Sequence, residues 1–226
     1  MTRRSYRRAA RVAGALALSA AAAAGCAPLD QLNAVATPTD LYLLTPKSTF
    51  DADLPKIREQ IVVDVPTATA AVSTDRIAVQ PSPLEVQYLP GARWVDRAPI
   101  IIQALLIESF ENSGKVGAVG RSNVDLRADY VIVTDVREFQ AQVPQDAPDS
   151  ALEVHVRLNV KIIDAERDRI VASESFERVT VAASDGMEDV AFAFDESLGA
   201  VMRKAVEWSV REMAARPISR RNRRAF

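Results

Sequence analysis

Residues 152–162 read LEVHVRLNVKI, an unbroken alternation of aliphatic and polar side chains. Successive side chains of a strand point to opposite faces, so this stretch has one aliphatic and one polar face. We expect a strand that covers a core on one side only. The turn-forming run 165–168 follows it, and Ile170–Val181 is expected to return as its antiparallel partner.

Two segments of helical periodicity lie on either side of this pair. The apolar residues of 98–113 recur at spacings of three and four, with Pro99 suited to the first turn and Gly114 to the stop. A longer helix is expected over 187–215, with Asp185 and Glu188 as its capping pair. Its apolar stripe consists of Val190, Phe194, Leu198, Val201, Ala205 and Trp208.

Shorter β-type runs precede the first helix. They cover residues 41–44, 61–65, 76–80 and 84–88, and a stronger strand is expected from Tyr130 towards Gln142. Residues 47–60 are interpreted as an exposed connection. Together, these expected strands and helices predict an α+β fold with a mixed, largely antiparallel sheet and two amphipathic helices packed on one face.

The charges are unevenly distributed along the 226 residues, which hold 28 Lys and Arg against 30 Asp and Glu. Residues 1–25 and 216–226 carry five Arg each and no acid, so 26–215 has a formal charge of −12. An acidic body argues against nucleic acid as the main partner. The basic stretch 216–226 is interpreted as a solvated, disordered tail, with a charge match to the helix end or contact with anionic lipid as alternatives.

The N-terminus has the pattern of a lipoprotein signal peptide. A basic stretch is followed by the apolar run 12–24, which is too short for a permanent membrane span. Small residues then lead to Cys26, the single Cys of the chain. We expect cleavage after Gly25, lipidation of Cys26, and a tether over 26–40 that precedes a folded domain at 41–215. The alternative is that Cys26 lies by chance near an ordinary cleavage site.

Residues that could support catalysis are scarce. His155 is the one histidine, and with Cys26 assigned to the anchor neither a zinc site nor a Cys/His dyad can be assembled. The sequence has no Gly-x-Ser-x-Gly elbow and no phosphate-binding Gly-x-x-x-x-Gly-Lys motif. His155 is therefore interpreted as a solvated side chain and Trp94 as core packing, with a contact role for Trp94 as the minority alternative. We expect no enzyme activity, no cofactor and no metal.

The order of these features resembles the ABC-type transport auxiliary lipoproteins, among them the PqiC-like outer-membrane lipoproteins. The resemblance rests on the lipobox-like end at Cys26, the segment 41–46, Arg76–Val79, Glu85–Tyr88 leading to Trp94, Ala128–Ile132 and the terminal helix.

The resemblance implies a non-enzymatic docking subunit with three partners: an ABC ATPase, a permease and a periplasm-spanning MCE protein that carries lipid. A homo-oligomeric ring is left open. The residue after Cys26 is Ala27 and not Asp. This resembles the sorting rule of Gram-negative lipoproteins, in which a residue other than Asp at this position favours the outer membrane over the inner one. By its position the loop 143–150 could contact a partner. The alternative function is a structural or assembly lipoprotein of the envelope without lipid transport.

Overall fold

The chain divides into two units, Met1–Thr39 and Asp40–Phe226. The computed structural model describes residues 39–122, 127–148 and 150–217, and the account below concerns the second unit. Its elements in chain order are β1 (Asp40–Tyr42), β2 (Gln60–Val63), β3 (Thr67–Ala68), β4 (Arg76–Ser82), β5 (Glu85–Trp94), α3 (Ala98–Ser113), β6 (Ala118–Arg121), β7 (Tyr130–Gln142), β8 (Glu153–Asp164), β9 (Arg169–Val181) and α4 (Met187–Ala215).

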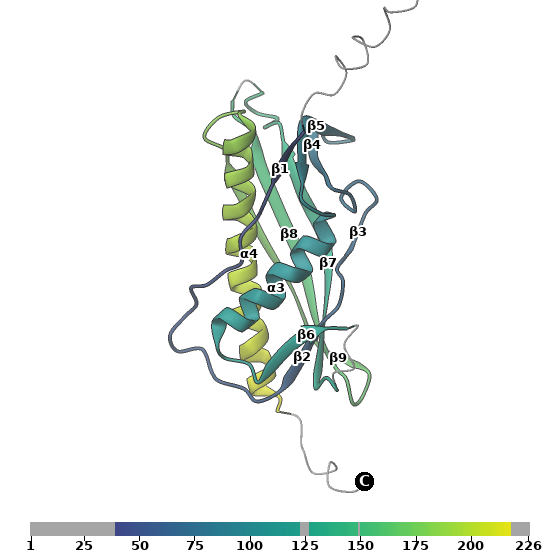
Figure 1. The fold of residues 1–226 in the computed structure, drawn as a ribbon, viewed down its shortest axis with the longest axis vertical. Coiled ribbons are helices and arrows are strands. Elements are labelled where there is room, and N and C mark those ends of the chain that lie inside the picture. Colours follow the sequence, from purple (N-terminus) through teal and green to yellow (C-terminus); the bar gives the residue numbers. More distant parts are fainter. Residues whose placement is uncertain (1–38, 123–126, 149, 218–226) are drawn as a thin grey trace, which may run out of the picture. The chain divides into compact units, whose positions relative to one another are not determined.

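The strands form one open, mixed, nine-stranded sheet. The long neighbours β7, β8 and β9 pair antiparallel, and so do β4 and β5. The short strands pair parallel: β1 with β5, β2 with β6, and β2, β3 and β4 with β7. Both helices lie on the same face of the sheet (Figure 1). The expected α+β class is therefore confirmed.

Strand β8 has the one-sided pattern that its sequence predicts. From Val154 to Ile162 every second residue is at most 1% exposed, and the residues between them are half-buried. The inner side chains face the helices, as the ring of Phe176 on β9 shows by its edge contact with Trp208 of α4. No helix of the described residues lies on the opposite, polar face of β7, β8 and β9 (Figure 1).

Helix α3 begins and ends at the expected residues. Pro99 lies in its first turn, and Gly114 ends it in the left-handed conformation at φ 60°, donating its N–H to the Glu111 carbonyl. Its exposed residues are confined to the last two turns, however, because no residue from Ala98 to Ile107 is exposed. The helix is thus more enclosed than a simple amphipathic pattern implies.

The interpretation of 47–60 as an exposed connection was wrong. Leu54 and Ile57 are 2% and 5% exposed and belong to the core. The segment is also tied to α4, since Asp51 accepts hydrogen bonds from Arg203 at 2.7 Å and Arg211 at 3.0 Å. The sequence does not reveal this because Leu54 and Ile57 are two apolar positions in a largely polar stretch, and Pro55 between them does not suit a helix interior.

Helix α4 also begins and ends as expected, but its cap differs. Gly186 occupies the N-cap without a side-chain hydrogen bond. Asp185 accepts a hydrogen bond from the Leu152 N–H instead, which ties the start of β8 to the start of the helix. The expected capping pair Asp185 and Glu188 is therefore not formed.

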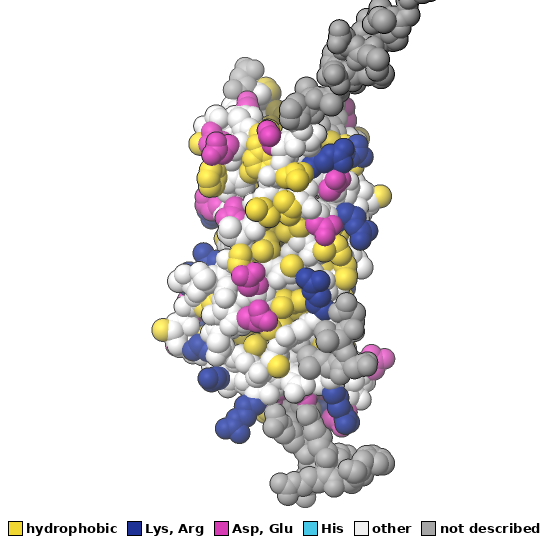
Figure 2. Space-filling view, in the orientation of Figure 1, with side chains coloured by type: hydrophobic (Ala, Val, Ile, Leu, Met, Phe, Trp, Pro, Cys, Tyr) yellow, Lys and Arg dark blue, Asp and Glu magenta, His cyan; other side chains and the backbone are white. Residues whose placement is uncertain are grey.

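Four parts of this unit meet at one end of the sheet, the upper end in Figure 1: the start of β1, the β4–β5 hairpin tip, the loop after β7 and the first turns of α4. The end of α4 and the β8–β9 turn lie at the opposite end. Hydrophobic side chains gather on the upper half of the helix-covered face, with acidic side chains beside them over the start of α4 (Figure 2).

Candidate functional site

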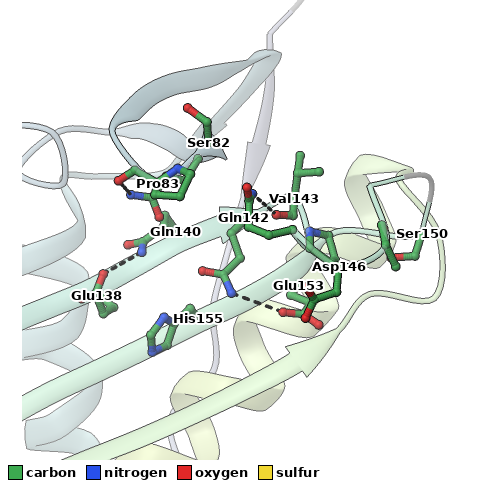
Figure 3. Close-up of a pocket in the computed structure, with 14 residues that line it drawn as sticks. Ser82, Pro83, Glu138, Gln140, Gln142, Val143, Asp146, Ser150, Glu153 and His155 are labelled. Atoms are coloured by element: carbon green, nitrogen blue, oxygen red, sulfur yellow. Dashed lines mark hydrogen bonds between the residues drawn. The ribbon is translucent and has the colours of Figure 1, made fainter.

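A polar cavity of about 510 Å³ opens at the upper end of the sheet, on its helix-free side. The β4–β5 hairpin and the loop after β7 form its walls, and the last residues of β7 with the first of β8 form its floor (Figure 3). Its lining consists of Gln80, Ser82, Pro83, Glu138, Gln140, Gln142, Val143, Pro144, Gln145, Asp146, Ala147, Ser150, Glu153 and His155.

Strand register brings the floor residues together. Gln140 lies opposite His155 and Gln142 opposite Glu153 in the β7–β8 pair. The Gln142 amide donates to Glu153 at 3.2 Å, and the Gln140 amide donates to Glu138 at 2.7 Å, as Figure 3 shows. A register shift between Val136 and Glu138 reverses the alternation of β7, so Glu138 and Gln140 lie on the polar face although Val136 lies in the core.

Glu138 is the most strongly stabilised carboxylate of this floor. Arg157 donates to it at 2.6 Å, in addition to the bond from Gln140. Partial burial alone would raise the pKa of Glu138, but the hydrogen bonds from Gln140 and Arg157 outweigh it, so its pKa is lowered. The carboxylate therefore remains charged to lower pH than an ordinary glutamate.

His155 is held in place, so the expectation of a solvated side chain was wrong. Its Nε2 lies 2.5 Å from a Glu177 carboxylate oxygen on β9, and its side chain is 17% exposed. Glu177 stands opposite Arg157 in the β8–β9 pair, so it lies diagonally across from His155 on the same face. A carboxylate partner orients the ring, but no serine hydroxyl is bonded to it among the described residues, as a catalytic dyad would need.

The lining determines which ligands the cavity favours. Three carboxylates, those of Glu138, Asp146 and Glu153, line it together with four glutamine amides, and His155 is the one basic side chain in that lining. Such a surface favours cationic or neutral hydrogen-bonding groups over anions. No cluster of three or more potential metal ligands occurs within 39–122, 127–148 and 150–217.

The other residues singled out by the sequence lie in different places. Cys26 and Gly25 lie outside the described residues, and so does position 149 of the loop 143–150. Trp94 is 2% exposed and packs in the core, as expected, which excludes its minority role as a surface contact. The loop after β7 supplies part of the cavity wall. Sequence reasoning missed the amides of Gln80, Gln140 and Gln142, because only strand register brings them together.

The described part of the chain holds no helix that is long and apolar enough to cross a bilayer.

Comparison with known proteins adds three relatives. A Xanthomonas campestris protein of the DUF330 family is 29% identical, and its crystal structure superposes with a TM-score of 0.73 over 78% of this chain and 98% of that one. A second crystal structure, of an uncharacterized protein, shares the fold at a TM-score of 0.53 with 10% identity, over 79% of this chain and 98% of that one.

An uncharacterized protein of Bradyrhizobium diazoefficiens is 29% identical over 177 residues. The match covers 73% of this chain but 45% of that protein, so this chain spans about half the length of that relative.

A family model supplies the assignment. The model for the ABC-type transport auxiliary lipoprotein component matches residues 42–206, from β1 to the middle of α4. This range holds strands β2 to β9, the last residue of β1, helix α3 and the residues that line the polar cavity. The chain therefore belongs to the family of ABC-type transport auxiliary lipoprotein components.

Proposed function

We propose that this chain is a non-enzymatic, lipid-anchored subunit of an MCE-type ABC transport system, which docks the periplasm-spanning MCE protein at the outer membrane for lipid transport. The observation that carries the proposal is the family match over residues 42–206, since that family is described as an auxiliary component of ABC-type transport.

The anchor supplies the link to the membrane. Acyl chains on Cys26, after cleavage behind Gly25, would attach the mature N-terminus to the bilayer. The folded unit begins at Asp40, fourteen residues later, and an extended chain of that length spans at most about 50 Å. The body would then remain within this distance of the membrane that holds the lipid.

The proposed partners are the MCE protein, the permease and the ATPase of the same system, and a second copy of the chain in a homo-oligomer. The cavity chemistry supports a binding role, because its polar groups are bonded to one another and to carboxylates in a fixed arrangement. Such an arrangement can hold a partner or ligand without reacting with it.

The experiment is crosslinking in native membranes, followed by purification of the tagged full-length chain and mass spectrometry. Recovery of an MCE-domain protein with its permease and ATPase is the expected result. Recovery of surface-polymer or secretion machinery without any transport subunit would favour the structural lipoprotein alternative.

A further inference from the structure

An exposed aromatic ring lies in the second turn of α4. Phe192 is 66% exposed, whereas its neighbours Ala191, Ala193 and Phe194 are buried. Ordinary surface positions of a helix rarely carry Phe, because an exposed aromatic ring gains nothing from packing in the isolated protein.

Carboxylates surround this ring on the helix. Glu188 and Asp189 lie four and three residues before Phe192, and Asp195 and Glu196 lie three and four residues after it. These spacings make all four its neighbours on the helix surface. Phe192 thus has two carboxylates on the turn before it and two on the turn after it.

A hollow lies on each side of the ring. One, of about 330 Å³, is lined by Leu43 and Tyr42 next to β1 together with Glu188 and Asp195 of α4. The other, of about 320 Å³, is lined by the end of β9 and by Asp189 and Glu196. Leu43 at 72% and Val181 at 60% exposure add apolar surface to the two hollows. We call Leu43, Val181, Phe192 and the four carboxylates the Phe192 surface.

The body itself neutralises little of this charge. Arg178 is the one basic side chain that forms an ion pair with these four carboxylates among the described residues, through Glu196 at 3.3 Å. Asp195 accepts hydrogen bonds from the Thr45 N–H and hydroxyl, and Asp189 accepts one from Ser184. These neutral donors leave three negative charges around the ring.

We infer that the Phe192 surface is the docking site for a cationic, amphipathic segment of the periplasm-spanning partner protein. The inference rests on the proposed function and names the contact that it needs. Aliphatic side chains of the segment fill the two hollows, and its Lys or Arg side chains meet the carboxylates and the face of the ring.

Charge complementarity favours this occupant over the membrane. The Phe192 surface lies at the same end as the start of β1, so the tether would bring it near the bilayer (Figure 1). Anionic lipid headgroups repel carboxylates, whereas a basic protein segment is attracted by them and its association is accelerated. Figure 2 shows this juxtaposition of hydrophobic and acidic side chains at the upper end of α4.

The first test uses the full-length chain in native membranes with a photoreactive phenylalanine analogue in place of Phe192. Its matched control carries the analogue in place of Leu84, a fully exposed residue at the hairpin tip. Irradiation should give an adduct with the MCE-domain protein from position 192 and not from position 84. An adduct with a second copy of the chain alone, with lipid alone, or with nothing would overturn the inference.

The second test compares partner binding by purified full-length variants in detergent. Phe192→Ala should weaken binding of the MCE-domain protein roughly thirty-fold or more, as loss of a central aromatic contact does. Glu188→Lys should weaken it several-fold and flatten its salt dependence, because Glu188 has no bonded partner within the described residues to lose. Leu84→Ala should bind as the unaltered chain does.

The two proposals fail in different ways. If the unaltered chain recovers no MCE-domain protein, the proposed function fails and the docking site fails with it. If it recovers that protein and Phe192→Ala recovers it equally well, the docking site alone is refuted.

Discussion

At Gly117 the backbone passes so close to Arg58 that no side chain fits. A Cβ atom at this position would lie 2.4 Å from the Arg58 carbonyl oxygen, a backbone atom that cannot rotate away. The glycine therefore allows the approach of β6 to the segment before β2, where the Gly117 N–H also bonds the Glu59 carbonyl.

We predict that Gly117→Ala lowers the free energy of unfolding by about 1–3 kcal/mol, the usual cost of overpacking. Gly199→Ala is its control, because nothing lies within 4 Å of a Cβ in that position of α4. Alanine in a helix interior should stabilise by about 0.5–1 kcal/mol. Urea unfolding measures the change in the free energy of unfolding for both variants. Equal changes at the two sites would contradict the prediction.

Asp164 at the end of β8 is the second residue with a large expected effect. Its side chain is 5% exposed, and it accepts bonds from the Arg167 guanidinium at 2.6 Å and from the backbone N–H groups of Glu166 and Arg167. Burial alone would raise the pKa of Asp164, but these bonds exceed the burial effect and lower it.

A lowered carboxyl pKa contributes stability above the unfolded value of 3.8, and this stability is lost as the pH falls through the folded pKa. Asp164→Asn should therefore reduce the free energy of unfolding by about 1–3 kcal/mol at neutral pH. Between neutral and acid pH, the free energy of unfolding of this variant should also decrease less than that of the parent. Exposed Asp168 in the same turn serves as control through Asp168→Asn. Thermal unfolding between pH 7 and pH 2.5 measures how the stability of each variant depends on pH. If the stability of the parent and of Asp164→Asn decreased in parallel, the lowered pKa of Asp164 would be refuted.

Among the elements, α4 is joined to the sheet by three aromatic rings. Phe194 of α4 lies 5.0 Å from the ring of Trp94 on β5 and 5.1 Å from that of Phe139 on β7. All three side chains are at most 2% exposed. The cluster therefore connects three elements that are distant in sequence.

Two phenylalanines that are two residues apart on α4 should respond very differently to truncation. Phe194→Ala should cost about 3–5 kcal/mol of stability because it leaves a cavity in this cluster. The free energy of unfolding of Phe192→Ala should remain within about 0.5 kcal/mol of the value for the parent, because the Phe192 ring is mostly solvated. Denaturant midpoints measure the pair, and a large loss in Phe192→Ala would mean that its ring packs on the body.

The elements that the sequence predicts well are those with a sustained period. Helices α3 and α4 begin and end at the expected residues, and β8 follows its alternation from Val154 to Ile162. Strand β3, with two residues, has no period to detect, and β5 extends past Pro90 and Gly91 through a bulge in which Gly91 takes φ 70°. A short run of residues cannot reveal a bulge of this kind.

The polar cavity was less predictable than the fold. The loop 143–150 was expected at a surface, and it does line the cavity. Arg157 stands opposite Glu138 in the β7–β8 pair, and Glu177 lies diagonally across from His155 in the β8–β9 pair, so both contacts depend on strand register. Register arises from the packing of the whole sheet, so local sequence does not determine it.

At the scale of the whole molecule, the proposed anchor at Cys26 can be tested directly. We predict that Cys26→Ser, expressed in the native host, removes the acyl anchor and shifts the chain from the membrane fraction to the soluble periplasmic fraction. Mass spectrometry of the parent should find acyl chains on the mature N-terminal cysteine. Unmodified Cys26 in the membrane-bound parent would refute the anchor, and a separation of inner and outer membranes tests the proposed location.

The position of β1 has a mechanical consequence for an anchored protein. Any tension on the tether would reach the body through Asp40, the first residue of β1, and one component of it would act along that strand. The hydrogen bonds between β1 and β5 run across the strands, so a force along β1 loads them together in shear. A force perpendicular to the strand would instead break them one after another. The bonds from Thr45 to Asp195 then pass the load to α4, the longest element. A tether attached to the proposed anchor at Cys26 would thus be connected to α4 through the β1–β5 pairing and the contact of Thr45 with Asp195.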